Sequence, residues 1–194
     1  AVCTGEVKEG ILHVTSLVKS PNSGMRKGEV IDIEDCVSAI SSAIQMTEQE
    51  IQSQLTSAYV GIGGSHISTH VSRGTVAISK PNGEITQIDI DRAIETSRVI
   101  ALPVNKEIIH VIPKYFVIDG QDETKDPIGL SGVRLEVESL IICGNSNSIK
   151  NLSRCVSQAG LSVDGLLFSP LATSHAILDK KLKETGVVLI DIGG

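Results

Sequence analysis

The sequence predicts an α/β domain that is interrupted by a smaller α+β insert at roughly residues 64–132. The first observation is a regular alternation after Val133 of strand-length apolar segments and segments with an apolar helical face. Such an alternation implies a parallel sheet with helices against its faces. The second observation is a change at Gly64, after which alternating strand-like segments surround one short capped helix. Glycines at residues 63–64 and 129–132 mark the two junctions of this insert.

The first part of the chain indicates a hairpin, a helix and a buried strand. Residues 1–7 and 10–18 are typical of two paired strands. Asp32 is expected to cap a helix with Asp35 at its third position, because carboxylates suit the positive end of the helix dipole. Residues 57–63 form a short apolar run that predicts a buried strand. The apolar face of the helix would consist of Ile33, Val37, Ile40, Ile44 and Ile51.

The insert is expected to contain strands around its one helix. Residues 66–78 alternate as a half-buried strand or hairpin does. Thr86 and Asp89 have the spacing of a capping box, with Asp in place of the usual Glu, for a helix that runs to about Leu102.

Two strand pieces bent at Pro113 are expected over residues 107–119, and residues 120–132 are polar enough to be a loop. The part after residue 133 is predicted to run strand, helix, strand, helix, strand over residues 134–143, 149–159, 163–168, 171–182 and 187–191.

The composition excludes some classes of function. A net charge of −6 and only 2% aromatic residues argue against nucleic-acid binding, which uses basic surfaces and stacking side chains. No apolar run approaches the roughly 20 residues that a membrane span needs, and no secretory signal is visible at the start. The cysteines have no zinc spacing and are expected to be reduced thiols: Cys3, Cys36, Cys143 and Cys155.

The strongest chemical candidate lies at the end of the chain. A buried strand would deliver Asp191 at its carboxyl end, followed by Gly193 and Gly194. Ligands of α/β sheets bind at this edge, glycines let backbone N–H groups approach phosphate oxygens, and an Asp can hold a metal ion through water. An ordinary turn gives the same pattern and is its commoner origin. The chain starts at Ala1 and ends in this glycine turn, so we expect it to be an internal part of a longer protein.

Other candidate sites are weaker. Residues 61–64 are not a dinucleotide fingerprint, because His66 stands in the place of the third glycine, and a strand-to-insert hinge is the expected role. His66 and His70 are four residues apart but have no third ligand nearby, so a metal site is not expected. No serine has the context of a hydrolase nucleophile.

Six segments together resemble the FtsA family of bacterial cell division proteins. The most distinctive is Asp-Pro-Ile-Gly-Leu-Ser-Gly-Val-Arg-Leu at residues 126–135, which is similar to the family's N-P-x-G-h-S-G-x-R-L, where h is hydrophobic. His-Val-Ile-Pro at residues 110–113 begins another. The six segments follow the family's order along the whole chain: residues 24–34, 59–67, 110–119, 126–135, 169–174 and 191–194.

The resemblance implies an actin-like (ribonuclease-H-like) fold with a small inserted α+β subdomain. It places subdomain 1A at residues 1–61 and 134–186, the insert (subdomain 1C) at residues 62–133, and the start of subdomain 2A at residues 187–194. These boundaries agree with those drawn from the pattern of the residues.

The resemblance also implies that the protein binds ATP and Mg²⁺. Asp191, Gly193 and Gly194 would belong to the second phosphate motif, with Asp191 reaching the metal through water. The first phosphate loop is expected just before Ala1 and the rest of the second motif after Gly194, so the site is expected to be incomplete in these residues.

The function that the resemblance implies is that of a scaffold with at most weak ATPase activity, not an enzyme. Such a protein takes part in Z-ring assembly, anchors FtsZ to the membrane, recruits later division proteins and self-associates into filaments through its insert. It would lie peripherally on the cytoplasmic face of the inner membrane at the septum, held by a C-terminal helix outside these residues. Two alternatives are a pilus-assembly adaptor of the PilM kind, which residues 126–135 disfavour, and an actin-fold sugar kinase, for which no motif is visible.

Overall fold

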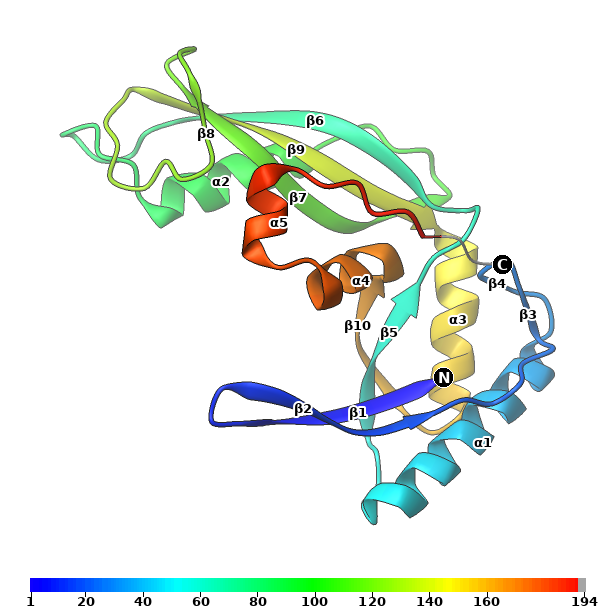
Figure 1. Ribbon diagram of the computed structural model, residues 1–194. Helices are drawn as coiled ribbons and strands as arrows, with labels where there is room; N and C mark the ends of the chain where they lie inside the picture. Colours follow the sequence, from blue (N-terminus) through cyan, green and yellow to red (C-terminus); the bar gives the residue numbers. More distant parts are fainter. Residues whose placement is uncertain (192–194) are drawn as a thin grey trace. The chain divides into compact units, whose positions relative to one another are not determined.

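A computed structural model describes residues 1–191 and divides into two compact units (Figure 1). Unit 1 comprises Ala1–His66 together with the residues from Ser146 onward, and unit 2 comprises Ile67–Asn145. Unit 2 therefore interrupts unit 1 in the sequence, which confirms the expected α/β domain with an α+β insert.

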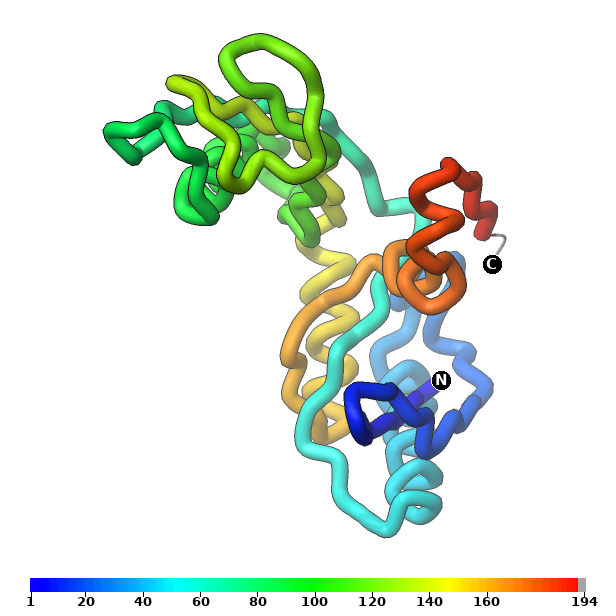
Figure 2. The backbone as a smooth tube through the Cα atoms, turned by 60° about the vertical axis from the view of Figure 1, so that its left-hand side comes forward, coloured from blue at the N-terminus to red at the C-terminus, as the bar shows by residue number. Residues whose placement is uncertain are grey.

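Unit 1 contains three pairs of strands and four helices among the described residues. Strands β1 and β2 form the expected antiparallel hairpin, and β3 pairs with β4 in a second, shorter one. Strands β5 and β10 run side by side in parallel (Figure 2). The elements are β1 (Val2–Lys8), β2 (Ile11–Val18), β3 (Met25–Arg26), β4 (Glu29–Val30), α1 (Ile33–Ile51), β5 (Ser57–Ile62), α3 (Ser146–Gln158), β10 (Ser162–Phe168), α4 (Ser169–Ile177) and α5 (Lys180–Thr185).

Helix α1 begins as the sequence predicts. The Asp35 backbone N–H donates a hydrogen bond of 2.9 Å to the carboxylate of Asp32, which caps the helix. Of the expected apolar face, Ile44 is buried and the other members are half-buried. The face also buries Thr47, whose hydroxyl donates to the Ala43 carbonyl at 2.8 Å and so is satisfied within the helix.

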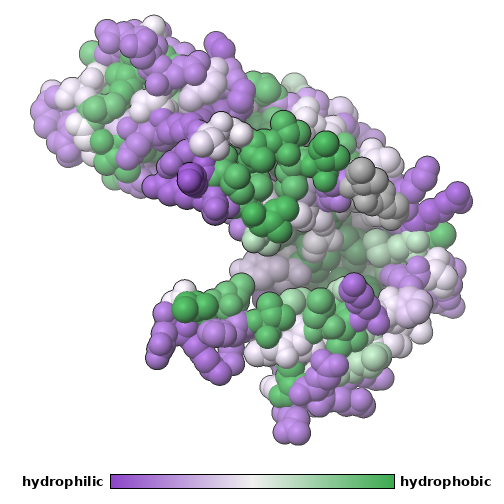
Figure 3. Space-filling view, in the orientation of Figure 1, coloured by the Kyte–Doolittle hydropathy of each residue, from purple (hydrophilic) through white to green (hydrophobic). Residues whose placement is uncertain are grey.

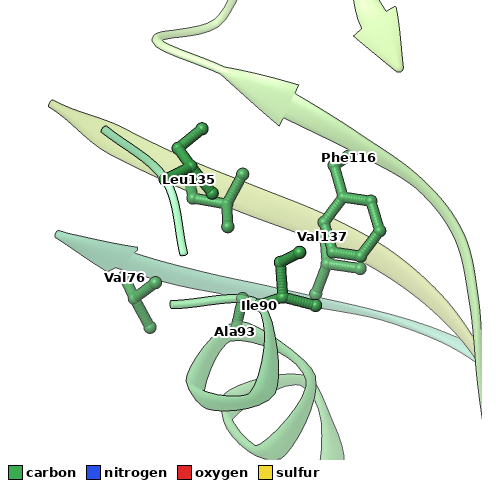
Figure 4. Packing of buried hydrophobic residues seen from close by; sticks show 7 residues of the cluster. Val76, Ile90, Ala93, Phe116, Leu135 and Val137 are labelled. Atoms are coloured by element: carbon green, nitrogen blue, oxygen red, sulfur yellow. The ribbon is translucent and has the colours of Figure 1, made fainter. Parts of the chain in front are cut away.

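Unit 2 is a four-stranded antiparallel sheet with one helix packed on it. The strand order is β6-β9-β7-β8. In Figure 4, Ile90 and Ala93 of α2 lie against the side chains of the sheet. The elements are β6 (Ser68–Ala77), α2 (Gln87–Arg98), β7 (Lys106–Ile118), β8 (Glu123–Thr124) and β9 (Arg134–Asn145). The core consists of Val76, Ile85, Ile90, Ala93, Phe116, Leu135 and Val137.

The capping box of α2 is present, and its carboxylate has a larger role than the spacing suggests. Asp89 is fully buried and accepts hydrogen bonds from the backbone N–H and hydroxyl groups of both Ser79 and Thr86. Burial by itself would raise the pKa of the Asp89 carboxyl, but these hydrogen bonds outweigh it and hold the pKa below the ordinary value. The carboxylate thus joins the start of α2 to the segment that follows β6.

The expected end of the insert at residue 133 is corrected by strand β9. This strand lies between β6 and β7 and pairs with both, so residues 134–145 belong to unit 2 and not to the surrounding domain. Leu135 and Val137 of β9 supply part of the unit 2 core, which explains why the strand is apolar. The names of the subdomains stay a prediction.

Three further expectations inside the units were wrong in detail. Helix α2 ends at Arg98 and not near Leu102. The two strand pieces bent at Pro113 are one strand, β7, whose register shifts next to Ile108 and Pro113 absorb the irregularity. The single helix expected over residues 171–182 is two helices, α4 and α5.

The strand expected at residues 187–191 was also wrong. Residues 186–191 have no regular secondary structure, and the apolar side chains of Val187, Val188 and Ile190 are exposed. A strand needs a neighbour to satisfy its backbone, and none pairs with this segment in the part of the chain that the structure describes.

Candidate functional site

Of the residues predicted to bind phosphate, the structure describes Asp191 alone. Asp191 is exposed, and Gly193 and Gly194 lie outside the described residues. The adjoining apolar side chains of Val188 and Ile190 are exposed. The assignment of Asp191, Gly193 and Gly194 to ATP and Mg²⁺ therefore stays a prediction.

Unit 1 contains a slot between strands β1 and β5. Cavities of about 420 Å³ and 820 Å³ are both lined by residues of these two strands, including Val2, Cys3, Ala58 and Tyr59. Among the described residues β1 pairs with β2 alone and β5 with β10 alone, so each strand has one unpaired edge. Unpaired strand edges offer backbone N–H and C=O groups to another strand. The slot therefore suits one additional strand.

The β1–β2 hairpin has one packed face, with Ser16 and Val18 buried, and one apolar, exposed face. The packed face lies against α1, where the buried Ser16 hydroxyl donates to the Glu50 carboxylate. The exposed apolar side chains appear as hydrophobic surface in Figure 3. They are Val7, Leu12, Val14 and Leu17, which the strand register places as neighbours. An apolar sheet face of this kind marks a surface that another element covers.

The glycine-rich junction at residues 61–64 packs against the β3–β4 hairpin. A Cβ atom on Gly28 would lie 2.3 Å from the Gly63 carbonyl oxygen, so the two backbones touch. His66 at this junction is buried, and His70 on β6 is exposed. Within the described residues no group of three or more His, Cys, Asp or Glu side chains could hold a metal ion.

A loop at one end of unit 2 presents apolar side chains on a well-anchored backbone. This tip loop, residues 127–133, begins at Pro127, which is fully buried. It is bonded to the segment before α2, because the Ile85 N–H donates to the Leu130 carbonyl at 2.9 Å. At its other end the Val133 N–H donates to the Asp119 carboxylate at 3.0 Å. The exposed fractions of the apolar residues of this loop are 55% for Ile128, 46% for Leu130 and 77% for Val133.

The sheet of unit 2 carries a three-strand ion-pair cluster. The largely buried carboxylate of Glu138 on β9 accepts from Arg73 on β6 at 2.9 Å and from Lys114 on β7 at 2.6 Å. Hydrogen bonds from Lys114, Tyr115 and Arg73 lower the pKa of Glu138 to about 2. These contacts connect the three strands, and the Glu138 carboxylate therefore has a structural role.

Sequence reasoning missed the slot, the exposed hairpin face and the ion-pair cluster, because each depends on which strands are neighbours. The tip loop was recognised only as a distinctive segment. The helices of the described residues lack the combination of length and apolarity that crossing a bilayer requires.

Residues 64–143 match the family described as the SHS2 domain inserted in FtsA. This range nearly coincides with unit 2, and it includes most of β9. The match agrees with the unit boundary in the structure and not with an insert that ends at residue 133.

Several curated proteins are similar to the chain along its length. The cell division protein FtsA of Bacillus subtilis (strain 168) is 39% identical over 193 residues, which cover 100% of this chain and 44% of that protein. FtsA of Borreliella burgdorferi is 41% identical over 94% of this chain and 44% of its own length. FtsA of Escherichia coli (strain K12) is 35% identical over 100% of this chain and 46% of its own length.

A solved structure, titled as a PilM–PilN type IV pilus biogenesis complex, is similar in fold. It superposes with a TM-score of 0.56 over 93% of this chain and 47% of that chain, at 14% sequence identity. This likeness supports an actin-like fold and says nothing of a shared role. The chain spans less than half the length of the curated relatives named above. Because it is 35–41% identical to them along nearly all of its residues and contains the family's inserted domain, the chain belongs to the FtsA family of cell division proteins.

Proposed function

We propose that this chain is the part of an actin-like, ATP-binding division scaffold that carries its partner-binding insert. The observation that supports this most is the tip loop of unit 2. Its apolar side chains are exposed although its backbone is held at both ends by buried Pro127 and by the Asp119 carboxylate. A rigid loop loses little conformational entropy on binding, so exposed apolar residues on it suit a protein contact.

The two buried carboxylates of unit 2 have structural roles, which is compatible with a scaffold. Asp89 is saturated by hydrogen bonds from Ser79 and Thr86, and Glu138 by ion pairs with Arg73 and Lys114. Carboxylates occupied in this way join structural elements and are not free to act as general acids or bases. We therefore place the insert's role in contacts with a second copy of the protein and with later division proteins.

Nucleotide binding is proposed for the whole protein. Asp191, Gly193 and Gly194 would supply the second phosphate motif, and the first would come from residues that precede Ala1. The slot between β1 and β5 supports this arrangement, because a segment that turned tightly into Ala1 would pair with the free edge of β1. An enclosed nucleotide site needs groups from both sides of a cleft, so residues 1–194 alone should hold only part of it.

The proposed partners are FtsZ, later division proteins and further copies of the scaffold. We place the protein on the cytoplasmic face of the inner membrane at the septum, attached by a C-terminal amphipathic helix outside these residues. A pilus-assembly adaptor role is less supported, because the likeness to the PilM–PilN complex is one of fold at 14% identity.

The test uses the full-length protein with Leu130→Asp and, separately, Val133→Asp. Each places a charge on the tip loop without touching the core of unit 2, so folding should be retained. We expect self-association in sedimentation and recruitment of later division proteins to fall at least about tenfold, as at an interface hot spot, while ATP binding persists.

The matched control is Val104→Asp, because Val104 is as exposed as any apolar residue of unit 2 but lies in the loop before β7. This control should self-associate like the wild type. If the tip-loop variants also associate and recruit normally, the loop is not the contact surface and the proposal fails.

A further inference from the structure

The β3–β4 hairpin touches the exit of strand β5 backbone to backbone. Gly28 has φ of 79°, and a Cβ atom there would be 2.3 Å from the Gly63 carbonyl oxygen. Gly64 has φ of 119°, and a Cβ atom there would be 2.5 Å from the Lys27 carbonyl oxygen. Neither position accepts a side chain without moving the other segment. The hairpin therefore lies directly on the segment through which the chain leaves unit 1.

One side chain of the hairpin spans this contact. The Ser65 hydroxyl donates to the Glu29 carboxylate at 3.0 Å, and the same oxygen lies 3.5 Å from Nδ1 of His66. The Glu29 side chain is 40% exposed, so water competes for its oxygens. A solvent-exposed hydrogen bond of this kind contributes little to closing the contact.

The His66 imidazole is buried without a hydrogen bond. Its side chain is 5% exposed, and neither Nδ1 nor Nε2 has a hydrogen-bond partner within the described residues. Buried polar groups are nearly always bonded, and each exception calls for a cause. An unsatisfied buried polar group shifts an equilibrium toward its hydrated state by roughly 5- to 150-fold.

We propose that the β3–β4 hairpin, Glu29, Ser65 and His66 form a releasable clasp over the exit of β5. In the closed clasp the imidazole has lost water and gained no hydrogen bond, only the 3.5 Å approach of Nδ1 to the Glu29 carboxylate. When the hairpin lifts, both ring nitrogens can bond to water. The imidazole therefore leaves the closed clasp only slightly more stable than the open one. An apolar side chain of similar size would stabilise the closed clasp more strongly.

The position of the clasp gives it a consequence for the insert. His66 is the last residue of unit 1 before the insert, and Ile67 is the first of unit 2. Opening of the clasp frees the connecting segment, residues 63–66, and leaves the β5–β10 pairing intact, because that pairing ends at Ile62.

Trypsin cleavage of the native full-length protein measures this opening. Arg26 and Lys27 are exposed but lie in the tight β3–β4 turn against Gly63 and Gly64, so cleavage after them requires the hairpin to lift. When closing is faster than cleavage, the cleavage rate reports the open population. Cleavage after Lys125, in the exposed loop of unit 2, provides an internal reference.

The expected result is that His66→Leu slows cleavage after Lys27 by about tenfold, because the apolar side chain removes the unsatisfied group. Ser65→Ala should speed that cleavage only slightly, because the hydrogen bond that it removes is exposed to solvent, and cleavage after Lys125 should not change in either variant. His70→Leu is the matched control, because His70 is exposed on β6 and should leave both rates unchanged.

A His66→Leu protein that is cleaved after Lys27 as fast as the wild type, or faster, would overturn the proposal. Gly28→Ala gives a second test. It leaves His66 in place and does not depend on how the His66→Leu variant folds. The added methyl group would meet the Gly63 carbonyl, so cleavage after Lys27 should rise at least about tenfold. An unchanged rate in this variant would equally overturn the clasp.

Discussion

Substitution of Asp89 by Asn should weaken unit 2 more than any other conservative change of a charged residue there. Oδ1 of Asp89 accepts from the Ser79 N–H at 3.0 Å and hydroxyl at 2.7 Å, and Oδ2 accepts likewise from Thr86 at 3.0 Å and 2.7 Å. An amide nitrogen cannot accept, so Asp89→Asn leaves one of the two backbone N–H groups facing another donor. The charge that strengthened the remaining bonds is also lost.

The magnitude follows from these contacts. An unsatisfied buried donor costs about 1–3 kcal/mol, and loss of charge assistance and of the helix cap adds about 1 kcal/mol. We expect Asp89→Asn to lower the free energy of unfolding of unit 2 by about 3 kcal/mol, a large part of the 5–15 kcal/mol typical of a domain of ordinary size.

The assay is urea unfolding monitored through the hydrogen exchange of peptides from β9 and α2, which reports the unfolding of unit 2 separately from that of unit 1. Asp91→Asn is the control, because Asp91 is exposed on the same helix and makes only a surface contact with Gln87. That control should change the unfolding free energy by less than about 0.5 kcal/mol. A loss below about 1 kcal/mol for Asp89→Asn would refute the role given to this carboxylate.

Three further outcomes follow from the structure. Gly74→Ala on β6 should destabilise unit 2 by about 1–3 kcal/mol or more in urea unfolding, because its Cβ would lie 2.1 Å from the Ala93 carbonyl oxygen of α2. A pH series of thermal unfolding should show that unit 2 loses stability as pH falls below about 4. Folding lowers the pKa of Glu138 to about 2. Such a carboxylate stabilises the fold above its unfolded pKa and ceases to do so as it is protonated. In the full-length protein, Asp191→Ala should weaken Mg-ATP binding by about 1–3 kcal/mol in calorimetry, and residues 1–194 alone should show no micromolar ATP binding. Unchanged stability of the Gly74 variant, a stability of unit 2 that does not fall at acid pH, or unaltered Mg-ATP affinity of the Asp191 variant would each contradict the corresponding reasoning.

Local signals in the sequence were sufficient where the structure depends on neighbours along the chain. Asp32 and Asp35 predicted the start of α1, and Thr86 and Asp89 predicted the start of α2, because a cap involves residues three apart. The turn at residues 80–83 has an equally local origin, because the Gly83 N–H donates to the Lys80 carbonyl.

The misplaced boundary of the insert has a non-local cause. Strand β9 is apolar and precedes a helix, as a strand of the surrounding α/β domain would, and only its pairing with β6 and β7 shows that it belongs to unit 2. Residues 187–191 were misjudged for a related reason. An apolar run has the composition of a strand, but it becomes one only beside a partner edge.

The candidate surfaces show the same division. The distinctive pattern of residues 126–135 was visible in the sequence, but the exposure of Leu130 and Val133 was not. Exposure depends on the anchoring of the loop by Pro127 and by Asp119, which lies outside the loop. The sequence offered no role for the His66 side chain, and only the structure shows that its imidazole is buried without a hydrogen bond.

Removal of unit 2 from the full-length protein tests most directly whether the insert is the interaction surface of the scaffold. The deletion should take out residues 67–145 and join His66 to Ser146, because a deletion that stopped before β9 would leave that strand without its partners. We expect ATP binding to persist, while self-association and recruitment of later division proteins are lost. Filaments and normal recruitment in this deletion variant would contradict the account.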